Sequence, residues 1–138
     1  MASWFDRFRG NKPPDAALRG TPPLRREKTY SSDTGYVYQY YYEGYRESQR
    51  DGGGGHEHVF NVTSDRVSRF SMTLFLATRV LDAWQRENER ELTLTERYAI
   101  VKLSLFEAFD ERTDLGPGAA DCRITKEQIE AHSATLDL

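Results

Sequence analysis

The sequence predicts an α+β domain: a three-stranded antiparallel meander followed by two or three helices packed on one sheet face, with a disordered N-terminal arm. Three observations predict this class. Four of the five prolines lie within residues 11–35. Aromatic or apolar side chains then alternate with polar ones through residues 36–76, as in half-buried strands, and recur with helical spacing from residue 77 onward. Strands that precede helices, rather than alternating with them, are typical of α+β folds.

The N-terminal segment 1–33 is expected to be a flexible, basic arm. It carries seven Lys and Arg residues against four acidic ones, whereas the chain of 138 residues as a whole has a net charge of −3. Polar segments rich in proline and glycine bury too little apolar surface to fold by themselves. Residues 34–138 are therefore expected to form a single domain, which carries the negative charge.

An aromatic tip stands at the start of this arm. Trp4, Phe5 and Phe8 would share one side of a two-turn helix, and a helix of that length is not stable alone in water. Its aromatic rings need a surface to pack against. We therefore expect these three residues to dock on a partner, on the domain or on a membrane surface.

The first strand is expected in "YVYQYYYEGYRES", where residues 36–45 hold six of the eight tyrosines. The more apolar side is assigned to the core, and Tyr41 and Tyr45 are then expected on the outer face. There, together with Arg46, they are candidates for binding a protein or for stacking against bases. The inward-facing set is Tyr36, Tyr38, Tyr40 and Tyr42.

Two further strands are expected, in "HEHVFNVT" and "VSRFSMTLFL". The last of these has a competing interpretation, because residues 65–88 also carry a helical stripe of apolar side chains. We favour a strand, since small polar residues alternate there with the larger apolar ones.

Helices are expected after these strands. The first has an apolar stripe running from Ala77 to Trp84. The second begins at a capping box formed by Thr93 and Glu96, and "LGPG" follows its end. A second capping-box pattern at Thr125 predicts a short terminal helix.

The pair His56 and His58 is a candidate metal site, because residues two apart on a strand point the same way. Zinc requires three or four protein ligands. His132, Cys122 or carboxylates could complete such a set, but nothing in their spacing requires it. No cofactor is expected. The glycine run at residues 52–55 has neither the Walker A nor the dinucleotide spacing.

The compartment is expected to be the cytoplasm. Cys122 is the only cysteine, so no disulfide can form within the chain. No apolar run is long enough for a transmembrane segment, and the first ten residues lack the apolar stretch of a signal peptide.

Among functions, the sequence favours a small intracellular non-enzymatic interaction module over an enzyme. It would bind a protein partner or form a homodimer through a sheet edge. One alternative is single-stranded nucleic-acid binding through the Tyr-rich strand and the basic arm, although no RNP-type or KH-type motif is present. A second alternative is a metal-dependent enzyme that uses His56 and His58. The acidic domain is also compatible with a basic target.

Overall fold

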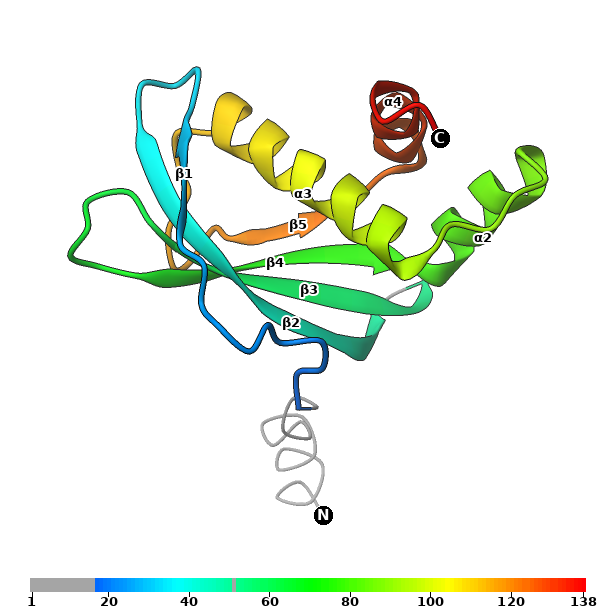
Figure 1. The fold of residues 1–138 in the computed structure, drawn as a ribbon, viewed down its shortest axis with the longest axis horizontal. Helices are drawn as coiled ribbons and strands as arrows, with labels where there is room; N and C mark the ends of the chain where they lie inside the picture. The colour runs from blue at the N-terminus through cyan, green and yellow to red at the C-terminus, as the bar shows by residue number, and fades with distance from the viewer. Residues whose placement is uncertain (1–16, 51) are drawn as a thin grey trace, which may run out of the picture.

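The structure is a computed structural model that describes residues 17–50 and 52–138. A sheet with helices on one face confirms the α+β class (Figure 1). The strands are β1 (Lys28–Ser31), β2 (Val37–Arg50), β3 (Gly53–Thr63), β4 (Phe70–Ala77) and β5 (Asp121–Arg123). The helices are α2 (Thr78–Glu87), α3 (Leu94–Glu111) and α4 (Lys126–Thr135).

The number of strands corrects the three-stranded prediction. The sheet has five strands in the order β1-β2-β3-β4-β5. The first four are antiparallel, but β5 is parallel to β4, so the sheet is mixed. The chain leaves β4, passes through α2 and α3, and returns to place β5 beside β4. With only three residues, β5 has no periodicity of its own and is defined by this non-local pairing.

Strand β1 lies within the segment 1–33 that is predicted to be an arm. It pairs antiparallel with β2, and Tyr30 lies opposite Tyr38. The Tyr30 ring stacks on Phe106 of α3 with 4.3 Å between ring centroids, and its hydroxyl donates a hydrogen bond to Asp110 at 2.7 Å. Part of the predicted arm, Lys28–Ser31, is therefore a strand of the sheet. The aromatic tip, Trp4, Phe5 and Phe8, lies outside the described residues.

Residues 70–77 are a strand, and the competing single helix over residues 65–88 is wrong. The helix starts only at Thr78, where the periodicity changes. Both predicted capping boxes are confirmed: the side chain of Thr93 accepts from the backbone of Glu96, and that of Thr125 accepts from Gln128. No helix in the described part of the chain has the length and apolarity needed to cross a membrane.

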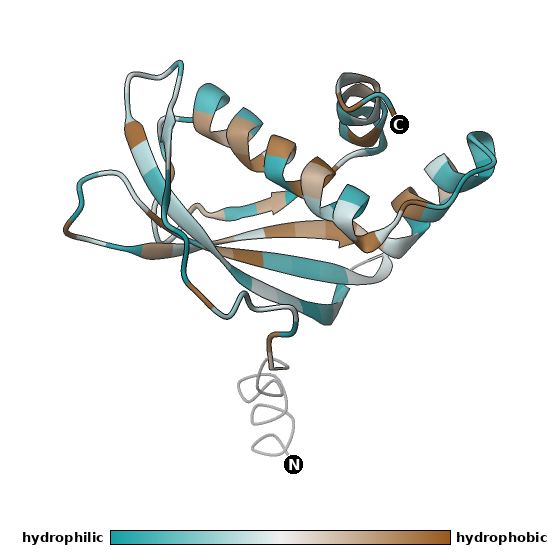
Figure 2. Cartoon of the chain, viewed as in Figure 1, coloured by the Kyte–Doolittle hydropathy of each residue, from teal (hydrophilic) through white to brown (hydrophobic). Residues whose placement is uncertain are grey.

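The core lies between the sheet and α3, which crosses the sheet face that α2 and α4 also cover (Figure 1). Figure 2 shows hydrophobic residues concentrated on β4 and α3. Tyr38 and Tyr40 are buried there, as predicted for the inner face of the first strand. Tyr36, assigned to the same face, precedes β2 and is 46 % exposed. The hydroxyls of the buried tyrosines stay protonated at neutral pH, because burial raises the pKa of Tyr40 to about 12.

A β-bulge in β2 changes which side chains face the helices. Tyr42 pairs with Phe60, and the next pair joins Gly44 to Val59, so Glu43 is an extra residue. Because successive side chains alternate between faces, one inserted residue reverses every later position. Tyr45 therefore lies on the helix-covered face with Tyr42, and the prediction that it faces outward is wrong.

Gly44 makes this bulge possible. Its φ of +126° is a conformation that side-chain-bearing residues rarely adopt. A Cβ atom there would lie 2.6 Å from the carbonyl oxygen of Arg19. That carbonyl accepts a hydrogen bond of 2.9 Å from the backbone N–H of Tyr45, so the chain before β1 lies directly against the bulge.

Replacing Gly44 by alanine should lower the free energy of unfolding by about 2 kcal/mol, because it combines backbone strain with a steric clash. Gly53 is a matched control, since its φ is +124° and nothing lies within 4 Å of a Cβ added there. Urea unfolding of Gly44→Ala and Gly53→Ala separates the two causes. Equal losses in both variants would show that close packing of the preceding chain contributes nothing.

Candidate ligand-binding cleft

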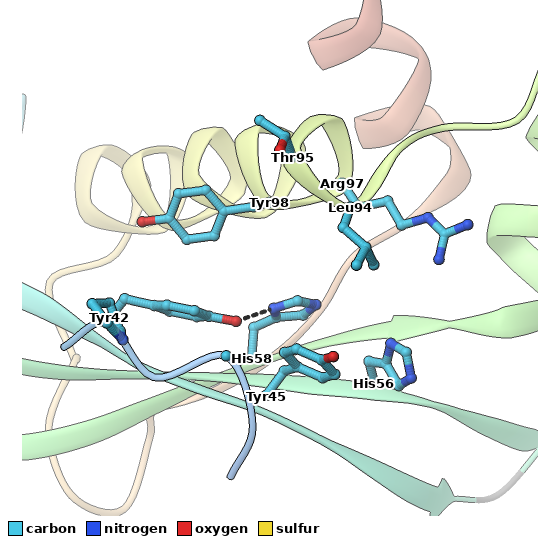
Figure 3. A pocket seen from close by; sticks show the side chains of 10 residues that line it. Tyr42, Tyr45, His56, His58, Leu94, Thr95, Arg97 and Tyr98 are labelled. Atoms are coloured by element: carbon cyan, nitrogen blue, oxygen red, sulfur yellow. Dashed lines mark hydrogen bonds between the residues drawn. The ribbon is translucent and has the colours of Figure 1, made fainter.

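A cleft of about 470 Å³ opens between the first turns of α3, the inner face of β2 and β3, and the chain that precedes β1 (Figure 3). Aromatic rings make up much of its wall. The lining residues are Gly20, Pro22, Tyr42, Tyr45, His56, His58, Leu94, Thr95, Arg97 and Tyr98.

The bulge creates the aromatic part of the cleft. Tyr42 and Tyr45 stand on either side of the extra residue, and both rings face α3. The ring of Tyr98 meets Tyr42 edge to face, with 4.8 Å between their centroids. Tyr45 lies 5.7 Å from His58 and 5.2 Å from His56 between ring centroids. The rings are half-buried, so part of each surface remains open to the cleft.

His58 is the most buried polar residue of the cleft, with 6 % of its surface exposed. Its Nδ1 lies 2.8 Å from the hydroxyl of Tyr42. Burial lowers the pKa of His58 to about 4, so the imidazole is neutral at pH 7. Burial also raises the pKa of Tyr42, which keeps its hydroxyl protonated.

A protonated tyrosine and a neutral imidazole can share a hydrogen bond in either direction, and we assign the Tyr42 hydroxyl as the donor. The Tyr42 hydroxyl hydrogen needs an acceptor, and Nδ1 of His58 is the one that the structure places within reach. The hydroxyl therefore donates to Nδ1, and the proton of the neutral imidazole resides on Nε2. Figure 3 shows Nε2 on the side of the ring away from Tyr42. The cleft thus presents an N–H donor from a neutral histidine.

Arg97 supplies the positive charge of the cleft. Its Nε donates a hydrogen bond of 3.0 Å to the carbonyl oxygen of Leu92, which orients the guanidinium. Figure 3 shows the guanidinium above His56, at the end opposite Tyr98 and Tyr42. No aspartate or glutamate is among the lining residues.

The pair His56 and His58 is the predicted metal site. They share a face, as predicted, with 6.4 Å between ring centroids. However, Nδ1 of His58 is occupied by Tyr42. Within the described part of the chain, no group of three or more histidine, cysteine, aspartate or glutamate residues could hold a metal ion.

Two other predicted binding residues, Tyr41 and Arg46, lie on the opposite face of the sheet. The guanidinium carbons of Arg25 and Arg69 lie 5.0 Å and 5.3 Å from the centroid of the Tyr41 ring, so cations cover that ring. Arg46 pairs with Glu57 at 2.9 Å. These contacts are typical of a solvated sheet face whose charges are already compensated.

The sequence assigns Tyr45 to one candidate surface and the pair His56 and His58 to another. The structure brings all three residues together in one cleft. Sequence reasoning missed Tyr98, Arg97 and Leu94, because nothing local shows which part of a helix overhangs a sheet. The one available signal was Gly44, since a glycine inside a strand pattern suggests a bulge.

Comparisons of the chain with protein-family models, with curated proteins and with solved structures find no match. The chemistry of the cleft therefore rests on its own residues. Aromatic walls, two neutral imidazoles and one guanidinium suit the binding of an organic molecule.

Proposed function

We propose that this protein is a small non-enzymatic binding module whose ligand site is the aromatic cleft. The observation that carries the proposal is the cleft of about 470 Å³. Small-molecule sites typically span roughly 300–1,000 Å³ and combine apolar and aromatic walls with a few polar groups. The expected ligand is therefore a small molecule with an apolar body that contains a ring.

The rings that line the cleft support this proposal. Aromatic residues of a closed core bury their whole surface, as Phe60 and Phe109 do here. Tyr42, Tyr45 and Tyr98 instead keep part of their surface accessible to the cleft. A ligand ring that covers these surfaces removes apolar area from water, which favours binding.

A protein partner or second copy that pairs with a sheet edge has less support. The two edge strands contain four residues in β1 and three in β5. Short edge strands offer few unpaired backbone groups, and proteins use them to prevent edge pairing. The cleft is the larger and better-defined candidate surface.

Binding of single-stranded nucleic acid also has less support. Tyr38 and Tyr40 are in the core and cannot stack against bases. On the outer face, the arginines beside Tyr41 and Glu57 already contact rings or carboxylates. Affinity for a polyanion depends on cations that can neutralise phosphates, and such paired cations contribute little.

The proposal is tested with N-phenyl-1-naphthylamine, a neutral aromatic probe that fluoresces in apolar surroundings. The full chain should bind it saturably, with one site per chain. Leu94 points from α3 toward the sheet and is 64 % exposed, so Leu94→Trp should place a larger ring in the cleft (Figure 3). We expect this variant to bind the probe at least tenfold more weakly.

Leu24→Trp is the matched control, because Leu24 is 66 % exposed and does not line the cleft. It should bind the probe like the unmodified chain. Thermal unfolding followed by circular dichroism verifies that both variants are folded. Absence of saturable binding, or equal binding by the Leu94→Trp variant, would show that the cleft is not a ligand site.

A further inference from the structure

We propose that the cleft selects an aromatic carboxylate: a planar ring system inserted between the tyrosines, with one carboxylate bound by Arg97 and by the Nε2–H of His58. This inference rests on the proposed function and specifies the chemical class of the ligand. It follows from the separation of two chemistries at opposite ends of the same cleft.

The charge of the lining favours an anion. Among the described residues, Arg97 is the one lining residue with a full charge, and none of the lining residues is acidic. Glu47, the strand partner of His56, is paired with Arg19 at 3.7 Å. The Arg97 Nε is engaged by the carbonyl oxygen of Leu92. That contact leaves the Nη groups available, and Figure 3 shows the guanidinium beyond Leu94, above His56. A guanidinium that is held by one contact loses little freedom when it binds a carboxylate.

His58 supplies a second donor toward the same end. Its Nδ1 lies 2.8 Å from the Tyr42 hydroxyl, and with the hydroxyl assigned as the donor the imidazole hydrogen is on Nε2. In Figure 3, this atom points away from Tyr42 and toward the part of the cleft where Arg97 and His56 lie. Because the imidazole is buried and its orientation is held by Tyr42, the N–H is pre-oriented before a ligand arrives. Pre-oriented donors lower the entropic cost of binding.

The other end accepts a ring. Tyr42 and Tyr98 meet edge to face at 4.8 Å, with an interplanar angle of 66°, and form a corner of two ring faces. Leu94 adds an apolar side chain between Tyr98 and Arg97, above His58 (Figure 3). A planar aromatic body makes stacked and edge contacts with such a corner, whereas a flexible alkyl chain would lose more conformational entropy on binding.

A matched pair of ligands tests the carboxylate. Isothermal titration calorimetry at pH 7 compares 2-naphthoate with 2-naphthalenemethanol, which has the same ring system and no charge. We expect 2-naphthoate to bind the full chain at least tenfold more tightly, because charge-assisted hydrogen bonds are stronger than neutral ones. Equal affinities would overturn the inference.

Variants then test whether Arg97 causes the preference for 2-naphthoate over the alcohol. Arg97→Gln should abolish the advantage of 2-naphthoate over the alcohol, and Arg97→Lys should restore part of it. Arg86→Gln removes the same charge from an exposed position on α2 outside the cleft, and it should preserve the full preference. A preference that survives in Arg97→Gln would contradict the assignment of this residue.

The outcomes separate this inference from the proposed function. If both naphthalene compounds bind equally and Leu94→Trp weakens both, the cleft is a ligand site without carboxylate selectivity. If neither compound binds and the neutral probe does not bind either, the inference and the proposed function fail together. If 2-naphthoate binds tightly but Leu94→Trp has no effect, the carboxylate site lies elsewhere and the inference is wrong.

Discussion

Phe109→Ala should lower the free energy of unfolding by about 4 kcal/mol, because large-to-small substitutions at closed core positions leave a cavity. Phe109 is 0 % exposed, and its ring stacks on Tyr38 with 4.1 Å between centroids and an interplanar angle of 7°. It also contacts the rings of Tyr30 and Tyr40. One side chain of α3 therefore joins the helix to both β1 and β2.

Urea unfolding monitored by far-UV circular dichroism measures this loss. Leu94→Ala is the control on the same helix, and it should change the free energy of unfolding by less than about 0.5 kcal/mol, because Leu94 is 64 % exposed. The near-UV signal of the tyrosines should fall selectively in Phe109→Ala, since Tyr38 loses its stacking partner. A loss below about 1 kcal/mol would mean that the ring stack around Phe109 is not closed in solution.

The elements that sequence predicts well are those whose pattern is local. Met72 and Leu74 alternate with small polar residues, and both are buried in β4. The capping boxes at Thr93 and Thr125 predict the starts of α3 and α4, because the hydrogen bonds of a cap join residues only three apart. In these cases the residues that stabilise an element lie within the element itself.

The strands that sequence misses depend on partners far along the chain. β1 exists because Tyr30 reaches Phe106 and Asp110, more than seventy residues away. β5 exists because its backbone pairs with Thr73 through Phe75 of β4. Neither strand has enough residues to show alternation, so a single sequence carries no periodic signal for them.

The cleft was partly predictable. The sequence predicts the tyrosine strand and the "HEH" pair as two separate candidate sites. Residues of both line the cleft. Their convergence depends on the bulge at Glu43, which reverses the facing of Tyr45. One inserted residue therefore determines whether the aromatic strand presents Tyr45 to solvent or to α3. A glycine in a strand indicates a possible bulge, but it does not show which face the following side chains take.

His58 should make the stability of the protein depend on pH by about 3 kcal/mol between pH 7 and pH 4. Burial lowers the pKa of His58 to about 4 in the folded protein, whereas an unfolded histidine has a pKa of about 6.5. Between these two values the unfolded chain binds a proton that the folded chain excludes. Stability therefore increases with pH across this window and is lost as the pH falls through it.

The surroundings of His58 support this sign. The neighbouring side chains on β2 and β3 are tyrosines and His56, and the titratable groups contributed by α3 are Arg97 and Tyr98. None of these carries a negative charge at pH 7 that would stabilise an imidazolium. The proximity of His56 lowers the pKa of His58 further. Burial and the neighbouring His56 therefore both favour the neutral form of the His58 imidazole.

His58→Gln isolates this contribution, because a glutamine oxygen can still accept from the Tyr42 hydroxyl but does not titrate. Chemical unfolding at a series of pH values from 7 to 4 should give a shallower decline for His58→Gln than for the unmodified chain. The pKa values of His56 and His132 are also lowered by burial, and both residues are present in the two proteins, so their effects cancel in the difference. Parallel pH curves would mean that His58 is solvated and that its Nε2–H is not the pre-oriented donor that carboxylate recognition requires.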